Sequence, residues 1–260
     1  QKNVIDEVMI KLSQDDKEVN ELTWTLLQMG VVVHIALDYT DNALPNRTIE
    51  RIGGYTCMTT SINTASSIPM GLKRLTDIMA GLVGCAITGV AFIFVAPLIY
   101  KASPGPIFYC QERVGKNGRR FKMYKFRSME IQKESEEKKA WTVKNDPRVT
   151  GIGKFMRHTS LDELPQLFNI LKGEMSLVGP RPERPFFVEK FREEIPRYMV
   201  KHQVRPGLTG WAQVNGYRGD TSIRKRIECD LYYIENWSVG FDIKIMFLTI
   251  FKGFINKNAY

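Results

Sequence analysis

The stretch that decides the fold is IMAGLVGCAITGVAFIFVAPLIY, residues 78–100, which contains no charged side chain. A helix of about 20 apolar residues is long enough to cross the hydrocarbon layer of a membrane, which is about 30 Å thick. Gly81, Gly84 and Pro97 would bend or weaken a helix in water, but membrane helices tolerate such residues. The segment therefore predicts a membrane helix.

Both flanks of this segment are basic. Lys73 and Arg74 precede it, and Lys101 and Arg113 belong to a second basic group that follows it. Because positive charge stays on the cytoplasmic side of a membrane, a helix that crosses once should have unequal flanks. Two interpretations remain open, a spanning helix and a re-entrant helix that breaks and returns to the same face. The equal flanks favour the re-entrant helix.

The residues before this segment predict a small α/β module. Strands are expected at Val4–Leu12, Val31–Leu37 and Ile52–Met58, and a helix at Asp15–Met29. The β-branched run after Gly30 is typical of a buried parallel strand. No G-x-G-x-x-G loop predicts dinucleotide binding here. We therefore expect a partial Rossmann-like module over residues 1–60, with a structural or regulatory role, and a linker over residues 61–72. The chain starts with Gln1 and shows no signal peptide, so we expect a segment upstream of it.

A hairpin is predicted after the apolar segment. Residues 106–110 and 121–126 alternate as strands do, and Asn117-Gly118 between them is a strong turn signal. The charged run Glu130–Lys139 is typical of a helix that faces solvent. We expect the membrane helix to occupy residues 73–102 and one further, mainly helical domain to occupy residues 103–260.

Charge and composition narrow the class of protein. The net charge is +9, yet residues 1–72 hold 5 Lys and Arg against 9 Asp and Glu, and the rest holds 32 against 19. This basic majority favours anionic partners, namely phosphates, nucleic acid or an acidic lipid face. The four cysteines form no C-x-x-C pair and the three histidines no spaced set, so zinc ribbons and redox dithiols are disfavoured. There is also no G-x-S-x-G elbow and no P-loop.

The densest chemical signal is RHTSLDELPQLFNILKGEMSLVGPRP, residues 157–182. Its leucines have helical spacing, and Gly173 is placed to end that helix. Asp162 and Glu163 stand at the predicted helix start, where two roles are open. They could cap the helix, Glu163 in a capping box with Ser160 or Asp162 as the N-cap itself. Alternatively, the positive potential of a helix N-terminus would lower their pKa and keep an ionised Asp beside a bound phosphate, whose phosphorus it could attack.

Arginines surround this stretch and could neutralise the phosphate. The candidates are Arg157, Arg181, Arg184 and, farther along, Arg205. Prolines on both sides of Arg181 restrict the loop that carries it. In the glycine-rich stretch 205–216, Trp211 could stack on a base or be buried in the core. The apolar faces of residues 223–234 and 241–254 fit either a lipid headgroup layer or a protein core.

The chain resembles the bacterial sugar transferases, the monotopic polyprenyl-phosphate phosphoglycosyltransferases, over about residues 73–260. The motifs that carry this resemblance are Lys73-Arg74, SPGPIF (103–108), QERVG (111–115), YKFRSM (124–129), TSLDELPQ (159–166), SLVGPRP (176–182), RPGLTG (205–210) and NWS (236–238). Residues 1–60 are similar to the end of the Rossmann-like module of larger members. The Ser-Pro that many relatives carry in the membrane helix is replaced by Thr88-Gly89, so the resemblance does not locate a helix break.

The resemblance implies a fold and a reaction. The expected fold is α/β, with a partial Rossmann-like module followed by a mainly helical monotopic membrane domain that has a re-entrant helix and a small β-hairpin. Asp162 would be the nucleophile and Glu163 its partner. Asp162 would attack the β-phosphorus of a UDP-sugar, release UMP and hold the sugar phosphate covalently until polyprenyl (undecaprenyl) phosphate takes it. This would be the first step of exopolysaccharide, capsule or O-antigen assembly.

The resemblance also implies the remaining parts of the site. Mg²⁺ would bridge Asp162, Glu163 and the diphosphate, a role that suits its preference for oxygen ligands. The matched motifs add Lys125 and Arg127 to the phosphate- and nucleotide-binding candidates. The expected location is the bacterial inner membrane, with the catalytic domain and its UDP-sugar on the cytoplasmic face and membrane lipid as a partner. The transferred sugar stays open, as does a homo-oligomer.

Two other classes of protein compete with the enzyme. A non-catalytic, membrane-tethered regulatory or assembly subunit would use Asp162 and Glu163 only as a helix cap. A nucleic-acid binder would explain the net charge, but the uncharged segment 78–100 argues against it. Replacing Asp162 by Asn separates the first class from an enzyme, because Asn caps a helix comparably but is not an anionic nucleophile.

Overall fold

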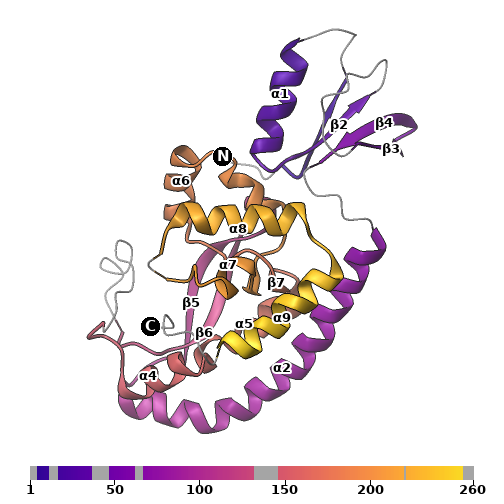
Figure 1. Cartoon of the computed structure of the whole chain (residues 1–260). Coiled ribbons are helices and arrows are strands. Elements are labelled where there is room, and N and C mark those ends of the chain that lie inside the picture. The colour runs from indigo at the N-terminus through magenta and orange to yellow at the C-terminus, as the bar shows by residue number, and fades with distance from the viewer. Residues whose placement is uncertain are drawn as a thin grey trace.

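The computed structural model describes residues 5–11, 17–36, 47–61, 67–131, 146–219 and 221–253. The charged run predicted at Glu130–Lys139 lies mostly outside these residues. The fold is mixed α/β and contains one long apolar helix, α2 (Figure 1). This helix forms an arc along one side of the chain, and helices α6 and α8 lie on the other side of the domain that it borders.

The N-terminal part is a four-stranded sheet with one helix. Its elements are β1 (Glu7–Ile10), α1 (Lys17–Gln28), β2 (Val32–Ala36), β3 (Arg47–Ile52) and β4 (Tyr55–Thr60). Strands β1 and β2 are parallel, β4 and β3 are antiparallel, and the order is β1-β2-β4-β3. The unit therefore holds one β-α-β crossover, and its assignment as Rossmann-like stays a prediction.

Two of the strands predicted in this part are confirmed and one is wrong. The first strand, the helix and the strand after Gly30 lie within their predicted ranges. The strand predicted at Ile52–Met58 instead spans a turn, because Gly53 and Gly54 adopt φ values of 57° and 88° and join β3 to β4. Glycine takes these left-handed conformations at no steric cost, so two adjacent glycines favour a tight reversal.

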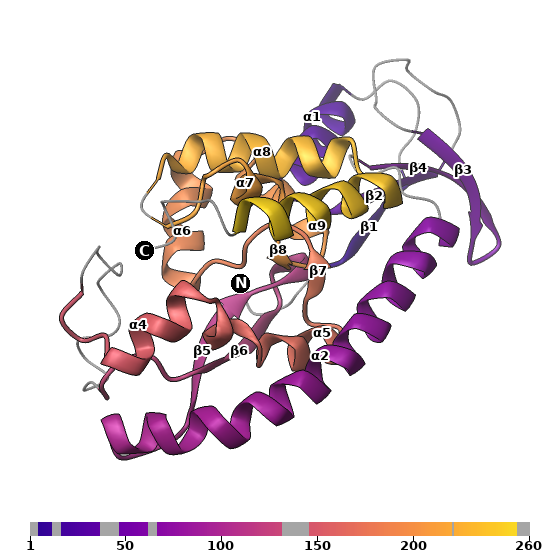
Figure 2. The same ribbon diagram turned by 60° about the horizontal axis from the view of Figure 1, so that its bottom comes forward.

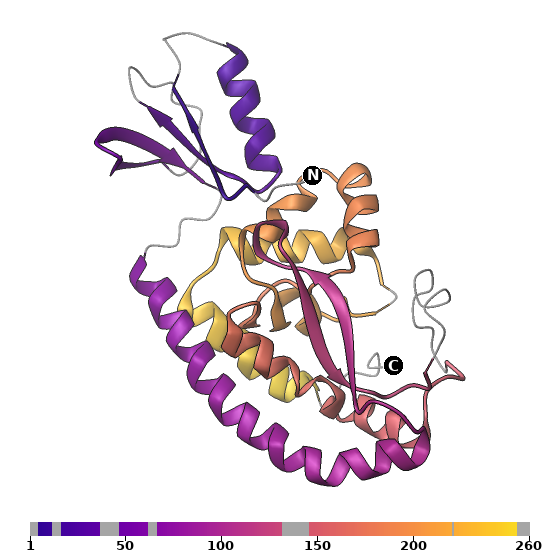
Figure 3. The same cartoon turned by 180° about the vertical axis from the view of Figure 1, so that it is seen from behind.

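Helix α2 (Ser67–Ala102) is continuous, with Pro97 inside it, and it curves around the following domain (Figures 1 and 3). Its first six residues lie within the range 61–72 that was predicted as a linker. Residues 68–102 are long and apolar enough to cross a membrane by length and composition. No break interrupts residues 67–102, so the predicted re-entrant break is not seen in this structure.

One face of α2 contacts the domain that follows it at both ends of the helix. Near the start, the Nζ of Lys73 lies 2.6 Å from Asp242 and 2.9 Å from the carbonyl oxygen of Val178. Near the end, Val95 and Ile99 are buried in the core. A helix of 36 residues is about 54 Å long at 1.5 Å per residue. The domain thus runs along most of this length.

The middle of α2 packs closely because two of its residues are glycines. A Cβ at Gly81 would lie 2.7 Å from the side chain of Leu171, and one at Gly84 would lie 2.4 Å from that of Leu167. Both leucines belong to α5 (Gln166–Lys172). The opposite face of α2 exposes a continuous series of apolar side chains: Leu75, Met79, Leu82, Val83, Ile87, Val90, Ile93, Phe94 and Leu98.

The predicted hairpin is confirmed. Strands β5 (Phe108–Val114) and β6 (Arg120–Phe126) are antiparallel, and Asn117 and Gly118 in the turn have φ values of 55° and 76°. Figure 2 shows the hairpin between α2 and the layer of α7, α8 and α9. The remaining elements of the domain are α4 (Gly151–His158), the 3₁₀ turn η2 (Leu161–Glu163), β7 (Ser176–Val178), α6 (Pro185–Glu194), η3 (Tyr198–Gln203), β8 (Gly207–Thr209), α7 (Trp211–Val214), α8 (Ile223–Glu235) and α9 (Val239–Gly253).

Core packing accounts for much of the apolar surface of the late helices. On α8, Ile227 and Ile234 are buried, and on α9 Ile245 is fully buried. Trp211 packs against the rings of Tyr232 and Phe241 rather than facing the pocket described below. An exposed apolar face remains on α9, formed by Ile243, Phe247, Ile250 and Phe251.

Candidate active site

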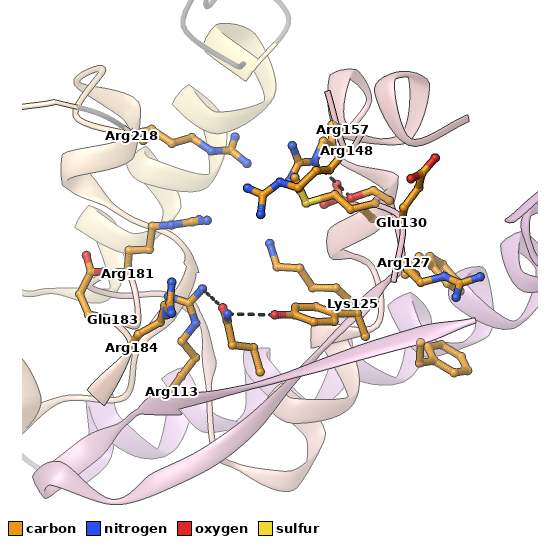
Figure 4. Close-up of a pocket in the computed structure, with 18 of the residues that line it drawn as sticks. Arg113, Lys125, Arg127, Glu130, Arg148, Arg157, Arg181, Glu183, Arg184 and Arg218 are labelled. Carbon is orange, nitrogen blue, oxygen red and sulfur yellow. Dashed lines mark hydrogen bonds between the residues drawn. The ribbon is translucent and has the colours of Figure 1, made fainter. Parts of the chain in front are cut away.

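A pocket of about 380 Å³ lies between the β5–β6 hairpin, the end of α4, the loop after β7 and the loop before α8. Its lining is dominated by cations (Figure 4). They are Arg113, Lys125, Arg127, Arg148, Arg157, Arg181, Arg184, Arg218 and Arg226, whereas the acidic residues in the lining are Glu130, Asp162 and Glu183. Such an excess of fixed positive charge in a concave site favours a polyanionic ligand.

The acidic pair Asp162 and Glu163 occupies the short turn η2 rather than the start of a long helix. Ser160 before the turn has a left-handed φ of 57°, and its side chain makes no capping hydrogen bond. Helix α5 begins only at Gln166, after Pro165, and ends at Gly173 as predicted. Neither predicted capping arrangement is therefore formed, because Pro165 separates the carboxylates from the helix that they were expected to cap.

Glu163 is clamped by three cations. One of its oxygens lies 2.8 Å from the Nζ of Lys125 and 3.5 Å from Arg181, and the other lies 3.3 Å from Arg218. Burial opposes ionisation of Glu163, but Lys125, then Arg181 and Arg218, outweigh it and hold its pKa well below the usual range. Glu163 therefore stays ionised and draws three separate segments of the chain together.

The pKa of Asp162 shifts in the opposite direction, upward. Asp162 is 7% exposed and lines the pocket. Burial raises its pKa, and the charge of Glu163 adds to this effect, while Lys125 and Arg157 oppose it. The expectation that a helix N-terminus would lower this pKa was wrong, because burial beside a second carboxylate is the larger effect here. The two adjacent carboxylates thus differ, with Glu163 as an ionised anchor and Asp162 as a more basic group that faces the pocket.

Several predicted phosphate-binding residues meet in this pocket. Lys125, Arg157, Arg181 and Arg184 all line it, together with Asp162. In Figure 4, the charged groups of Arg181, Arg218 and Lys125 point towards one open space. Arg157 also donates a hydrogen bond of 3.1 Å from its Nε to the hydroxyl of Ser128, which fixes its direction.

Two predicted residues are placed differently. The guanidinium of Arg127 donates to the carbonyl oxygen of Ser103 just after α2, and Figure 4 shows it turned away from Lys125. The guanidinium of Arg127 therefore contacts the residue that directly follows α2, although Arg127 is also part of the pocket lining. Arg205 is absent from the lining of this pocket. Arg205 instead lies near Arg74 of α2. Burial and the charge of Arg74 lower the pKa of Arg205.

Other arginines in the pocket were not chosen from the sequence. Arg113 belongs to the motif QERVG, but nothing in the sequence indicated that its side chain lies in the site. In the structure, its guanidinium donates to the carbonyl oxygen of Pro182. Burial lowers the pKa of Arg113 to about 10, with Arg181 and Arg184 adding to the effect. Neither Arg148 nor Arg218 has a spacing in the sequence that would have indicated a site.

The residues of the pocket can bind a magnesium ion only if a bound substrate supplies further oxygen ligands. Among the described residues, no group of three or more His, Cys, Asp or Glu side chains is placed to hold a metal. Lys125, Arg181 and Arg218 already occupy the oxygens of Glu163. Asp162 remains as the carboxylate that faces the pocket. Since Mg²⁺ commonly binds one or two carboxylates together with substrate phosphates, this donor set is compatible with a shared ion.

The end of the pocket nearest the membrane helix is apolar. Pro106, Phe108 and Ile131 line it. The ring of Phe108 stacks on Phe92 of α2, with centroids 5.6 Å apart, and on Phe126, with centroids 5.4 Å apart. The cavity therefore joins a cationic region to an aromatic cluster that includes a residue of the membrane helix.

Comparison with known proteins agrees with this geometry. A family model described as "Bacterial sugar transferase" matches residues 68–256. The chain is 42% identical to a UDP-glucose:undecaprenyl-phosphate glucose-1-phosphate transferase of Klebsiella pneumoniae, over 100% of this chain and 57% of the relative. It is 48% identical to a UDP-N-acetylgalactosamine-undecaprenyl-phosphate N-acetylgalactosaminephosphotransferase of Aeromonas hydrophila, over 69% of this chain and 43% of the relative.

A third relative is shorter. The chain is 45% identical to the exopolysaccharide production protein PSS of Rhizobium leguminosarum, over 69% of this chain and 93% of the relative. By contrast, the chain spans about half the length of the glucose-1-phosphate transferases that it matches.

Proposed function

The chain belongs to the bacterial sugar transferase family, and from this premise we propose that it transfers a sugar 1-phosphate from a UDP-sugar to undecaprenyl phosphate. The names of its relatives describe this reaction with different sugars. The observation that carries the proposal is the position of Asp162, a buried carboxylate with a raised pKa that faces a pocket lined by cations.

The reaction proceeds in two displacements at phosphorus. A carboxylate oxygen of Asp162 attacks the β-phosphorus of the UDP-sugar, and the bond between that phosphorus and the bridging oxygen breaks. UMP leaves with the electron pair of that bond, and the sugar phosphate stays on Asp162. An oxygen of undecaprenyl phosphate then attacks the same phosphorus. Asp162 leaves as a carboxylate, and the product is undecaprenyl diphosphate sugar.

The cations of the pocket make the first attack possible. Two anions repel one another unless nearby positive charge compensates, and fixed donors in a buried site do this more effectively than water. Arg181 and Arg218 contact Glu163 and lie beside the space that the diphosphate would fill. Lys125 lowers the pKa of Asp162 and so increases its ionised fraction.

Magnesium is part of the proposal. Asp162 and the diphosphate of the substrate would hold it, with Glu163 nearby. When bound, Mg²⁺ supplies further positive charge to the phosphates. Asp162 would remain the attacking group, and Glu163 would keep the surrounding cations in place.

The membrane arrangement follows from the contacts of α2. Lys73 and Ile99 both contact the same domain, and the outer face of the helix between them is apolar. A helix that crossed the bilayer would separate its ends by the membrane thickness, so these contacts favour a monotopic arrangement, in which α2 stays on one face of the membrane with its apolar outer face in the lipid. The proposed location is the cytoplasmic face of the bacterial inner membrane. There the aromatic cluster around Phe108 would receive the lipid chain of the acceptor.

The direct test is an assay of UMP release. Purified protein in detergent is incubated with Mg²⁺, undecaprenyl phosphate and each of several UDP-sugars. We expect one or more donors to give UMP and a lipid-linked sugar diphosphate. The Asp162→Asn variant should give neither product. If no donor yields UMP, or if the variant keeps full activity, the proposed function is wrong.

A further inference from the structure

A buried ion pair in the wall of the pocket holds two of its loops together. Arg226 of α8 is 2% exposed, and its guanidinium donates to the carboxylate of Glu183 at 2.9 Å. The same guanidinium donates to the carbonyl oxygen of Gly219 at 2.5 Å and to the hydroxyl of Thr221 at 3.3 Å. One side chain thus contacts both the loop before α6 and the loop before α8.

These two loops carry three of the arginines that line the pocket, Arg181, Arg184 and Arg218. Glu183 is two residues after Arg181 and directly before Arg184, and Gly219 directly follows Arg218. Arg181 contacts one carboxylate oxygen of Glu163, and Arg218 contacts the other. A third anchor comes from the hairpin, where the backbone N–H of Val114 donates to the carbonyl oxygen of Glu183 at 3.0 Å.

Stability alone does not explain why a buried ion pair occupies this position. Two charged groups lose their hydration on burial, and an apolar pair of similar volume is often as stable or more stable. A planar guanidinium, however, can hold a carboxylate and a carbonyl oxygen at the same time in fixed directions. The arrangement at Arg226 uses this property, since its donors reach both loops.

We propose that Arg226 and Glu183 are positioning residues that set the spacing of the anion-binding arginines Arg181, Arg184 and Arg218 across the pocket. The inference rests on the proposed function for its substrate, a nucleoside diphosphate sugar. Neither residue needs to touch that substrate. Their effect is transmitted through the two loops, whose guanidinium groups must match the separation of the phosphate oxygens.

The chain provides a matched control on the same helix. Lys201 of η3 and Asp230 of α8 form an ion pair of 3.0 Å, with both side chains 2% exposed. Neither residue lines the pocket. Disrupting this pair should lower stability for the same reasons as disrupting Arg226–Glu183, but it should leave the two pocket loops attached to one another.

The experiment compares Arg226→Gln, Arg226→Lys and Asp230→Asn with the wild-type protein. It measures thermal unfolding, KM and kcat for the UDP-sugar, and the affinity for inorganic pyrophosphate by calorimetry. We expect Arg226→Gln and Asp230→Asn to unfold at similarly lowered temperatures. Only Arg226→Gln should lose about 100-fold in kcat/KM, the order of loss that follows a displacement of about 1 Å in a site. Arg226→Lys should lie between these, since an ammonium group cannot hold both loops in the same geometry.

The outcomes separate this inference from the proposed function. If Arg226→Gln and Asp230→Asn reduce kcat/KM and pyrophosphate affinity equally, or if neither does, Arg226 has only a structural role and the inference fails. If the wild-type protein releases no UMP with any donor, the proposed function fails. The inference is then decided by pyrophosphate affinity, which needs no turnover and should still fall only in the Arg226 variants.

Discussion

Replacing Lys125 by Met removes the cation that contacts Glu163 most closely and most strongly favours ionisation of Asp162. Methionine keeps an unbranched side chain of similar length. The pKa of Asp162 is already raised by burial, and loss of Lys125 should raise it further. Because the nucleophile must be ionised, activity is lost as the pH falls through this pKa. The acid limb of the kcat/KM profile should therefore move to higher pH in the variant.

The size of the effect follows from the contacts around Glu163. Two unit charges 2.8 Å apart attract one another by about 6 kcal/mol at an effective dielectric constant of about 20. Arg181 and Arg218 remain at 3.5 Å and 3.3 Å and offset part of this loss. Removal of one fixed donor from a catalytic site typically costs about 3–4 kcal/mol, or 10²–10³-fold in kcat. We expect a loss of about 100-fold at neutral pH.

The assay is UMP release between about pH 5 and pH 9, with Lys122→Met as the control. Lys122 belongs to the same strand but is exposed, so its replacement changes the net charge equally and should leave the profile unchanged. A Lys125→Met variant with wild-type kcat/KM and an unshifted acid limb would refute the proposed electrostatic role of this lysine.

Three further predictions concern the membrane helix and the metal. Gly84→Val should destabilise the protein by about 1–3 kcal/mol by overpacking against α5. Gly89→Ala, with nothing within 4 Å of its Cβ, should not lower the melting temperature in detergent; equal melting of the two variants would contradict this packing. Lys73→Met should cost about 3–5 kcal/mol, because it leaves Asp242 buried with its ion pair broken, whereas Lys101→Met should cost little. Chelation with EDTA should stop UMP release and excess Mg²⁺ should restore it; undiminished release in EDTA would exclude the metal.

Short-range signals in the sequence predicted local structure well. The Asn117-Gly118 turn, the end of α5 at Gly173 and the first β-α-β unit depend on residues close in the chain, and all three are confirmed. The Gly53-Gly54 turn was missed because the apolar residues around it were treated as one strand. The 3₁₀ turn at Asp162 was missed because Pro165 was placed in the first turn of the helix rather than before it.

Contacts between segments that are distant in the sequence could not be predicted from it. Strands β7 and β8 pair in parallel and bring two of the quoted motifs side by side, but nothing in either motif specifies this pairing. Arg226 lies among basic residues on α8, yet it is almost fully buried. Its burial depends on Glu183, which is 43 residues earlier in the chain. Sequence periodicity does not indicate such a partner.

The central claim is that Asp162 becomes covalently bonded to phosphorus. The most direct measurement mixes protein, Mg²⁺ and a UDP-sugar substrate without acceptor lipid, quenches the mixture and maps the modified peptide by mass spectrometry. We expect about one UMP released per active site and a sugar phosphate on Asp162. A sugar phosphate on another side chain would contradict this claim, as would rapid transfer on addition of acceptor lipid when no UMP had been released beforehand.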